Sequence, residues 1–290
     1  MKGNMQTRLL FSVLIANYNN GRFLQEAVDS VFAQSYSNWE IILVDDKSTD
    51  NSFEIYDKYK DDSRFHVFFN EENKGCGYTK RRCAELANGE LCGFLDPDDE
   101  LLPNALECHL NAHKEDPLVS VVYSRSYYCD RRGNITGESK LLTLKEGETY
   151  FDYRWYGSMC FSSYKNSFYK QTEGISEKLL AGVDQDLYFK IEEVGKICVL
   201  NVFTYKYYQR NEKAITKNDS KLWYWNLVAR KAACERRGLN VDEILGEDLK
   251  YIFDCIRKDA SFEKEKEIRS SRAYRLGRSI LKPFSCLIKR

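Results

Sequence analysis

The sequence predicts an α/β fold in which helices cover both faces of a mostly parallel sheet. Two observations predict it. Short apolar runs alternate with segments of helical spacing over the first 124 residues. The runs are nearly continuous in apolar residues, which is typical of strands buried on both faces. Ligands of such sheets bind beyond the carboxyl ends of the strands, so residues that follow each strand are the first candidates for a site.

The first half of the chain is expected to contain five strands and the helices between them. Apolar runs predict strands at 11–16, 40–44, 65–69, 91–95 and 119–123. Apolar residues three and four positions apart predict helices at 23–33, 78–87 and 104–113, and N-cap candidates at 48–50 start another that runs to 59.

The second half changes character after residue 124. It contains a predicted hairpin turn at 130–134, an aromatic stretch at 150–169, a helix at 184–194, strands at 197–200 and 203–208, and helices at 221–236 and 241–257. We expect most rings of the aromatic stretch to pack in the core, and the others to shape a pocket. The predicted organisation is a domain at 1–215, with two halves (1–124 and 125–215), and a C-terminal helical region at 216–290.

Composition excludes some classes of protein. The chain has 290 residues, with 44 Lys and Arg against 44 Asp and Glu. Zero net charge argues against a nucleic-acid binder driven by a global basic field. Ten scattered cysteines without a C-x-x-C pair indicate a reduced, cytoplasmic protein without disulfides. The N-terminus lacks an apolar signal region, and no run approaches the roughly 20 apolar residues of a spanning helix.

Three carboxylates follow the predicted strand at 91–95. Clustered carboxylates repel one another, and a hard divalent cation such as Mg²⁺ or Mn²⁺ removes that cost. In an extended segment Asp96 and Asp98 would point to one side and Asp99 to the other. We predict that Asp98 contacts the metal and that Asp96 binds a ribose hydroxyl or a metal-bound water. Asp99 would be either a second metal contact or the cap of the following helix.

Two common phosphate cradles are absent from the sequence. The first predicted strand is followed by Asn-Tyr-Asn-Asn-Gly (17–21) and not by a G-x-G-x-x-G fingerprint, and there is no G-x-x-x-x-G-K-[ST] loop. A metal held by carboxylates is the alternative way to neutralise a diphosphate, and it stabilises a leaving diphosphate as a Lewis acid.

Several motifs occur together in a specific order. They are SVLIANYN (12–19), VDDKSTD (44–50), NGE (88–90), LDPDD (95–99) and, in the second half, GVDQDLY (182–188). As a set they resemble the inverting GT-A glycosyltransferases of family 2. The resemblance implies the GT-A (Rossmann-like) fold with a C-terminal helical appendage. It also implies a nucleotide-sugar donor, usually a UDP-sugar, a Mg²⁺ or Mn²⁺ ion, and a carbohydrate or lipid-linked glycan as acceptor. The nucleotide-binding half would then be 1–124 and the acceptor half 125–215, where the remaining rings of the aromatic stretch would shape the acceptor pocket.

The resemblance also assigns roles on the donor side. Ala16 and Tyr18 would line the base and ribose pocket, with Tyr18 stacked on the base, and Asp46 would bind the base edge. Lys80 or Arg81 would reach the diphosphate. The structural alternatives are a packing role for Tyr18, a turn or cap for Asp46, and a solvated helix face for the two cations.

On the acceptor side the resemblance points to Asp184 as the general base, which takes a proton from the attacking hydroxyl. The alternative is an N-cap, and Asp186 reads as a cap or first-turn acid. Many relatives carry a metal-ligating histidine after residues 207–208, where this chain has Gln-Arg-Asn. Asn211 would be a weak ligand, and Arg210 could neutralise the diphosphate instead, so the third protein ligand stays open.

Two further features have plainer alternatives. His109 and His113 are four apart on a predicted helix, as in half of a zinc site, but packing or surface exposure explains them better. From Lys264 the tail is basic and amphipathic, which suits either an anionic membrane surface at the inner face or packing on the domain. The rival functions are a nucleotidyltransferase and a non-catalytic, nucleotide-sugar-binding relative.

Overall fold

The structure, a computed structural model, describes residues 8–153, 161–210 and 219–259. The chain divides into two compact units. The sheet unit comprises Met1–Leu179 and Leu187–Glu212, and the helical unit comprises Leu180–Asp186 and Lys213–Arg290. The basic tail from Lys264 and part of the aromatic stretch (154–160) lie outside the described residues.

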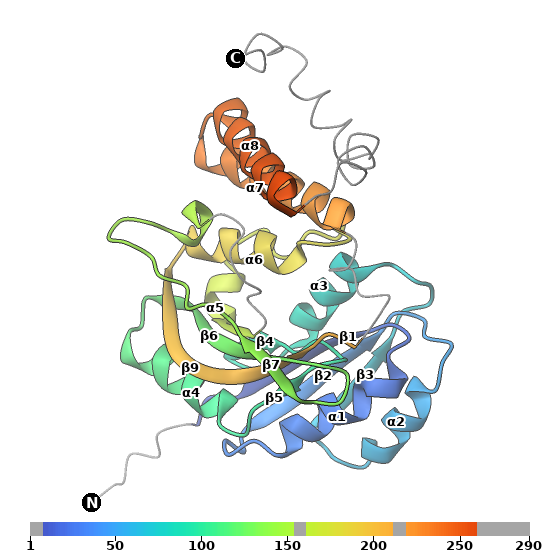
Figure 1. Cartoon of the computed structure of the whole chain (residues 1–290). Coiled ribbons are helices and arrows are strands. Elements are labelled where there is room, and N and C mark those ends of the chain that lie inside the picture. The colour runs from blue at the N-terminus through green and yellow to red at the C-terminus, as the bar shows by residue number, and fades with distance from the viewer. Residues whose placement is uncertain (1–7, 154–160, 211–218, 260–290) are drawn as a thin grey trace, which may run out of the picture. The chain divides into compact units, whose positions relative to one another are not determined.

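The predicted parallel sheet forms the first part of the sheet unit (Figure 1). Its strands lie in the order β3-β2-β1-β4 and run parallel. They are β1 (Phe11–Asn17), β2 (Trp39–Asp45), β3 (Phe65–Phe69) and β4 (Leu91–Phe94). Every residue of β2 is buried, as are the first five of β1, which confirms that these strands are covered on both faces.

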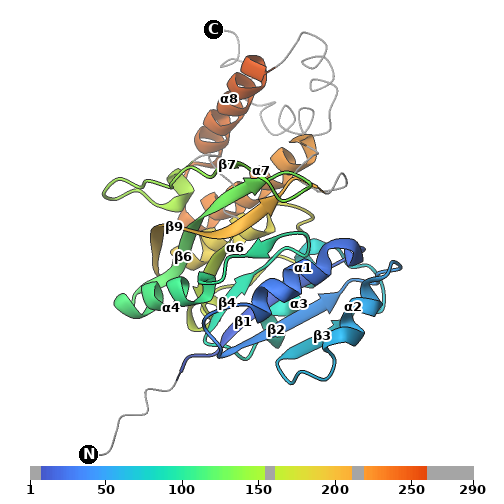
Figure 2. The ribbon, with the colours of Figure 1, turned by 60° about the horizontal axis from the view of Figure 1, so that its bottom comes forward.

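Helices cover the parallel strands on both sides. They are α1 (Gly21–Phe32), α2 (Ser52–Tyr59) and α3 (Cys76–Leu86). The first two connect strands that progress toward β3, whereas α3 returns the chain to β4 on the other side of β1. Because such crossovers are right-handed, α1 and α2 lie on one face and α3 on the other (Figures 1 and 2). The core on the first face joins Val13 and Leu43 of the sheet to Leu24 and Val28 of α1.

Beyond β4 the sheet becomes mixed. The added strands are β5 (Glu100–Leu101), β6 (Val119–Cys129), β7 (Ile135–Glu138), β8 (Ser162–Lys165) and β9 (Lys196–Tyr208). The antiparallel β8 lies between β4 and β6, and the sequence pattern did not predict it. The strands predicted at 197–200 and 203–208 are one continuous strand, because β9 pairs along β6 through several register shifts.

The sheet unit also contains α4 (Ala105–Glu115), the 3₁₀ turn η1 (Tyr150–Asp152) and α5 (Asn166–Tyr169). Most described rings of the aromatic stretch are core residues, as expected: Tyr150, Phe151, Phe161, Tyr164 and Tyr169 are buried. Helix α6 (Val183–Glu192) begins in the helical unit and ends in the sheet unit.

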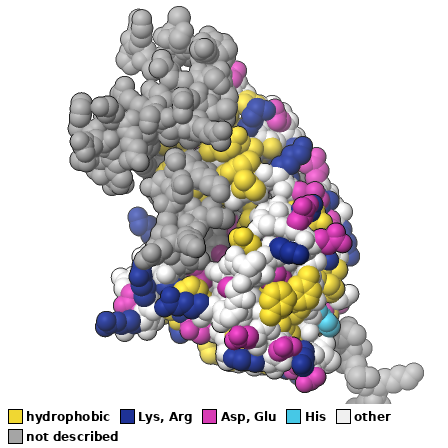
Figure 3. All heavy atoms as spheres, turned by 90° about the vertical axis from the view of Figure 1, so that its right-hand side faces the viewer, with side chains coloured by type: hydrophobic (Ala, Val, Ile, Leu, Met, Phe, Trp, Pro, Cys, Tyr) yellow, Lys and Arg dark blue, Asp and Glu magenta, His cyan; other side chains and the backbone are white. Residues whose placement is uncertain are grey.

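The helical unit contains α7 (Asp219–Arg237) and α8 (Val241–Asp259). Arg230 Nε of α7 and Asp248 Oδ2 of α8 form a buried ion pair at 2.5 Å. No helix among the described residues is long and apolar enough to cross a membrane. Figure 3 views the face that carries α2, where basic and acidic side chains are interspersed, consistent with the balanced charge of the chain.

Candidate active site

The carboxyl ends of β1, β2 and β4 meet at one edge of the sheet. Asn17 pairs with Asp45 across β1 and β2, and Leu14 pairs with Phe94 across β1 and β4. Hydrogen bonds extend this register beyond the strands, from Asp46 N to Asn17 O (2.8 Å) and from Leu95 N to Leu14 O (2.9 Å). The polar residues after these three strands therefore emerge side by side, as the sequence predicted.

The loop after β1 presents Tyr18 to solvent. Asn19 adopts a left-handed conformation (φ 55°), and its backbone N–H donates to Ser48 Oγ at 2.9 Å. Its side-chain oxygen accepts from Thr49 N at 2.8 Å, so the loops after β1 and β2 hold each other. Tyr18 is 48% exposed, and its ring is not a core residue. Ala16 is partly buried just before it.

A buried polar cluster supports these loops from below, and the sequence reasoning missed it. Asp45, at the end of β2, accepts hydrogen bonds from Tyr56 OH (2.5 Å) and Ser48 N (2.8 Å). Asn17 lies against the same tyrosine at 2.8 Å. Burial and the Asp45 carboxylate raise the pKa of Tyr56. Two consecutive acids at the end of a buried strand were the available signal, because successive side chains of a strand point to opposite faces. One of the two acids therefore had to face inward.

Asp46 is buried and organises the loop before α3. Its carboxylate accepts hydrogen bonds from Asn70 Nδ2 (2.7 Å), Lys74 N (2.8 Å) and Gly75 N (2.8 Å). Gly75 adopts φ 85°, which a residue with a side chain rarely takes. Asp46 thus shapes the backbone at this edge, and its contact with a base edge stays a prediction.

The segment after β4 is a tight turn and not the extended segment that the sequence suggested. Asp99 N donates to Asp96 O at 3.1 Å, which closes the turn. Asp99 is 1% exposed, and its carboxylate accepts from Tyr205 OH (2.8 Å) and Tyr208 N (2.7 Å) of β9. The helix-cap alternative for Asp99 is wrong, because the next helix begins only at Ala105. Burial, Asp98 and Asp96 raise the pKa of Asp99 well above its usual value.

The two candidate cations of α3 have different surroundings. Lys80 is buried, and its Nζ lies 3.4 Å from Asp96 Oδ1 and 5.0 Å from the centre of the Phe94 ring. Arg81 instead donates to Glu85 (2.8 Å) and to the carbonyl of Ile175 (3.1 Å). Of the two, Lys80 is the cation that reaches the turn at 96–99, which we call the carboxylate turn.

The donor set of the turn fits a hard divalent cation. Asp96 and Asp98 are partly exposed, whereas the Asp99 carboxylate is turned into the protein. Within the described ranges there is no group of three or more His, Cys, Asp or Glu that could hold a metal by itself. Mg²⁺ is commonly held by one or two carboxylates together with waters and phosphates, so the turn suits a metal that arrives with a diphosphate.

The acceptor-side candidates lie on α6. Asp184 is in the first turn of that helix and partly buried, within the helical unit. Asp186, in the same turn, is buried, and its Oδ1 lies 4.0 Å from Arg236 Nη1 of α7, which agrees with the first-turn acid predicted for it. The possible third metal ligand, Asn211, lies outside the described residues.

His109 and His113 are core residues. His109 contacts Ser163 Oγ (2.8 Å) and Ser124 Oγ (2.9 Å), and His113 contacts the same Ser163 Oγ at 2.9 Å. Burial lowers the pKa of His109 to about 3 and that of His113 to about 4. The packing role predicted for this pair is the one that the structure shows.

Comparisons with known proteins identify the family of the chain. The chain is 28% identical to the chondroitin synthase of Pasteurella multocida over 269 residues, covering 89% of this chain and 27% of that protein. It is 35% identical to the putative teichuronic acid biosynthesis glycosyltransferase TuaG of Bacillus subtilis over 144 residues, covering 49% of this chain and 56% of TuaG. The chain thus spans about a quarter to a half of these relatives' lengths.

Solved structures share the fold. S. aureus TarS 1-349, in complex with UDP, matches with a TM-score of 0.66 at 21% identity, over 89% of this chain and 78% of that one. The mannosyltransferase PcManGT of Pyrobaculum calidifontis, in complex with GDP-Man and Mn²⁺, matches with a TM-score of 0.61 at 14% identity, over 96% and 88%. The sequence model described as glycosyl transferase family 2 matches residues 12–173, more than half of the chain. The chain therefore belongs to glycosyl transferase family 2.

Proposed function

We propose that this protein transfers a sugar from a nucleotide-sugar donor, a UDP-sugar by preference, to a growing glycan in polysaccharide biosynthesis. One observation carries the proposal: three parallel strand ends bring Tyr18, Asp46 and the turn with Asp96 and Asp98 to the same edge of the sheet. An exposed ring suits a base, and two partly exposed carboxylates suit a metal-bound diphosphate.

The names of the relatives support the substrate classes. The similar proteins include synthases of chondroitin and hyaluronan and a putative teichuronic acid glycosyltransferase, all of which concern polysaccharides. The similar structures were solved with UDP, UDP-GlcNAc or GDP-Man, and one with Mn²⁺. A divalent cation bound at Asp98 would stabilise the departing diphosphate as a Lewis acid.

The residues of the chain would divide the work between donor and acceptor. Tyr18 stacks on the base and Asp46 fixes the loop around it. Lys80 lies beside the Asp96 carboxylate, which would bind a ribose hydroxyl or a metal-bound water. Asp184 accepts the proton of the acceptor hydroxyl while its oxygen bonds to the anomeric carbon and the bond from that carbon to the diphosphate breaks. Attack from the face opposite the leaving group inverts the anomeric carbon. Contact of the basic tail with a membrane remains a prediction.

A pair of substitutions tests the proposal by separating donor binding from transfer. Asp98→Asn should weaken the Mn²⁺-dependent binding of UDP, measured by titration calorimetry. Asp184→Asn should bind UDP as the wild type does and slow sugar transfer about 10²–10⁴-fold, the usual contribution of a general base. Transfer is followed by UDP release from a panel of UDP-sugars with an oligosaccharide acceptor.

The matched control is Asp57→Asn, which neutralises an exposed carboxylate on α2 whose side chain is 75% accessible. It should change neither binding nor transfer. Equal transfer by Asp184→Asn and wild type would contradict the base assignment, and UDP binding without turnover of any sugar would favour the non-catalytic alternative.

A further inference from the structure

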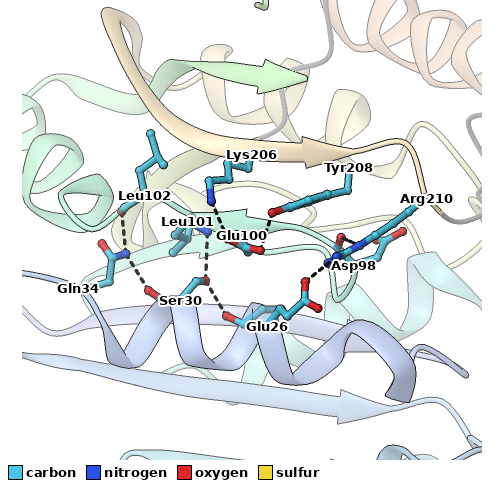
Figure 4. A network of polar contacts seen from close by, with 11 residues as sticks. Glu26, Ser30, Gln34, Asp98, Glu100, Leu101, Leu102, Lys206, Tyr208 and Arg210 are labelled. Atoms are coloured by element: carbon cyan, nitrogen blue, oxygen red, sulfur yellow. Dashed lines mark hydrogen bonds and ion pairs between the residues drawn. The ribbon is translucent and has the colours of Figure 1, made fainter. Parts of the chain in front are cut away.

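Arg210 contacts the carboxylate turn, helix α1 and the end of β9 (Figure 4). Its Nε donates to the backbone carbonyl of Asp98 at 3.2 Å, and its Nη1 forms an ion pair with Glu26 of α1 at 2.5 Å. The guanidinium also lies over two aromatic rings, 3.9 Å from the centre of Tyr208 and 4.6 Å from that of Phe23. The side chain is only 7% exposed, so this cation is part of the interior.

An arginine in this position cannot bind a metal ion, because a guanidinium is positively charged and has no acceptor atom. It can hold other groups in place. Glu26 and Phe23 are three residues apart on α1 and so face the same way, which lets one helix face grip the guanidinium by charge and by ring. A cation fixed in this manner makes its Nε–H a stationary donor for the Asp98 carbonyl.

The residues on either side of Asp98 are fixed by the end of the same strand. Tyr205 OH and Tyr208 N hold the Asp99 carboxylate, and Tyr205 OH also lies 3.3 Å from Asp96 N. Glu100 accepts from Tyr208 OH at 2.6 Å and pairs with Lys206 at 3.0 Å. The end of β9 therefore anchors the turn before and after Asp98, and Arg210, two residues beyond the strand, holds Asp98 itself.

From these contacts we infer that Arg210 is a positioning residue, which holds the Asp98 backbone so that the Asp98 carboxylate meets a divalent cation in a fixed geometry. The inference rests on the proposed function, since it concerns the metal of that same site. Metal sites need ligands held within about 0.5 Å, and residues that hold a ligand from behind typically change metal affinity about 10–100-fold.

The direction of the change in metal affinity distinguishes a positioning role of Arg210 from a simple effect of its charge. Removal of a positive charge near a metal site should by itself strengthen the binding of a dication. Loss of the hydrogen bond to Asp98 should weaken it. Arg210→Met removes both the charge and the donor, and Arg210→Lys keeps the charge but loses the planar donor and its fixed stacking.

Arg64 provides a matched control in the same unit. It also lies over two rings, Trp39 (3.9 Å) and Phe32 (5.2 Å), and pairs with an acid, Asp62 (2.8 Å). It precedes β3, at the opposite end of the parallel strands from the carboxylate turn. Arg64→Met therefore reproduces the loss of a stacked, paired arginine without touching the turn.

The experiment measures the apparent Kd of Mn²⁺ in the presence of UDP by titration calorimetry. We expect a rise of about tenfold for Arg210→Met, a rise of several-fold for Arg210→Lys, and values within about twofold of wild type for Arg64→Met. In metal-free protein, the backbone amides of the peptide 95–101 should exchange hydrogen faster in the two Arg210 variants than in wild type. Their exchange rate in Arg64→Met should equal that of wild type. The lysine variant keeps the test valid if the methionine variant does not fold.

Each outcome decides one point. Unchanged or tighter Mn²⁺ binding by the Arg210 variants overturns the positioning role and leaves the proposed function intact, because the wild type still binds metal and UDP. If the wild type shows no Mn²⁺-dependent UDP binding, the proposed metal site fails, and with it the role of Arg210 toward a metal. Unchanged hydrogen exchange at 95–101 overturns the hold on the turn itself.

Discussion

The carboxylate turn of the sheet unit and the start of α6 in the helical unit are held in different ways. In the turn, Asp99 bonds to β9 and the Asp98 carbonyl to Arg210, two residues beyond that strand, and both partners lie more than 100 positions later in the chain. At the start of α6, the buried Asp186 faces Arg236 of α7, and Gly182 lies against Asn226 of the same helix. The proposed donor residues thus depend on the sheet, and the proposed base depends on the C-terminal helices.

The family match ends within the sheet unit. It covers residues 12–173, which include the carboxylate turn but end before Asp184 and before β9. The first part of the sheet unit therefore carries the features common to the family, whereas β9 and the surroundings of the proposed base are built from a part of the chain beyond that match. Differences in acceptor between relatives would be expected to arise in this second part.

The largest effect should come from the ion pair that joins α7 and α8. Asp248→Asn leaves Arg230 as a buried cation without its carboxylate, and breaking a buried pair costs about 3–5 kcal/mol. The free energy of unfolding in urea should fall by this amount, and transfer should be lost along with it if the helical unit positions Asp184. UDP binding should persist, because its proposed residues belong to the sheet unit.

The control is an ion pair on the surface of the same helix. Lys231 and Glu235 are 43% and 55% exposed, so Glu235→Gln should change the unfolding free energy by less than about 1 kcal/mol. Equal losses of unfolding free energy for Asp248→Asn and Glu235→Gln would show that the buried ion pair does not stabilise the packing of α7 on α8. Loss of UDP binding in Asp248→Asn would mean that donor binding also depends on the helical unit.

The contrast between the units also explains what the sequence could predict. Continuous apolar runs revealed β1 to β4, and the acids after them located the strand-end site, because both signals are local. The short antiparallel β8 and the anchoring of Asp99 by Tyr205 and Tyr208 depend on pairing between distant segments, for which one sequence carries no local pattern. Likewise, the side-chain directions of Asp96 to Asp99 were predicted for an extended segment, whereas hydrogen bonds to β9 favour a turn.

Acid should weaken the sheet unit, because it contains two buried histidines, His109 and His113. Burial lowers the pKa of His109 to about 3 and, together with Lys165, that of His113 to about 4, against 6.5 for the unperturbed group. Between these values the unfolded chain binds more protons, so stability falls as pH decreases below 6.5. At pH 5 the loss is about 2 kcal/mol for one such histidine.

Urea unfolding at pH 7 and pH 5 measures this loss. In His113→Gln the difference between the two pH values should shrink by about the contribution of one histidine. An unchanged pH difference in that variant would mean that His113 does not remain neutral in the folded protein. Substitution of the exposed Lys231 by Gln in the helical unit should leave the pH difference as it is in wild type.

The smallest effect should be the difference between two glycine substitutions, which isolates one contact near the proposed base. Gly182 and Gly238 both lie in the helical unit with nearly the same φ, 65° and 63°. An added Cβ would lie 2.4 Å from Asn226 Oδ1 at Gly182 and would meet nothing within 4 Å at Gly238. Each change to alanine costs about 1–2 kcal/mol for the left-handed backbone, so their difference reports the contact with α7.

We expect Gly182→Ala to lower the unfolding free energy about 1 kcal/mol more than Gly238→Ala does, and to reduce kcat for transfer without changing the affinity for UDP. Asn226→Ala should remove most of this excess, because it shortens the side chain that the new methyl group would meet. If the two glycine variants behave alike in stability and in kcat, α7 does not set the position of the segment before Asp184.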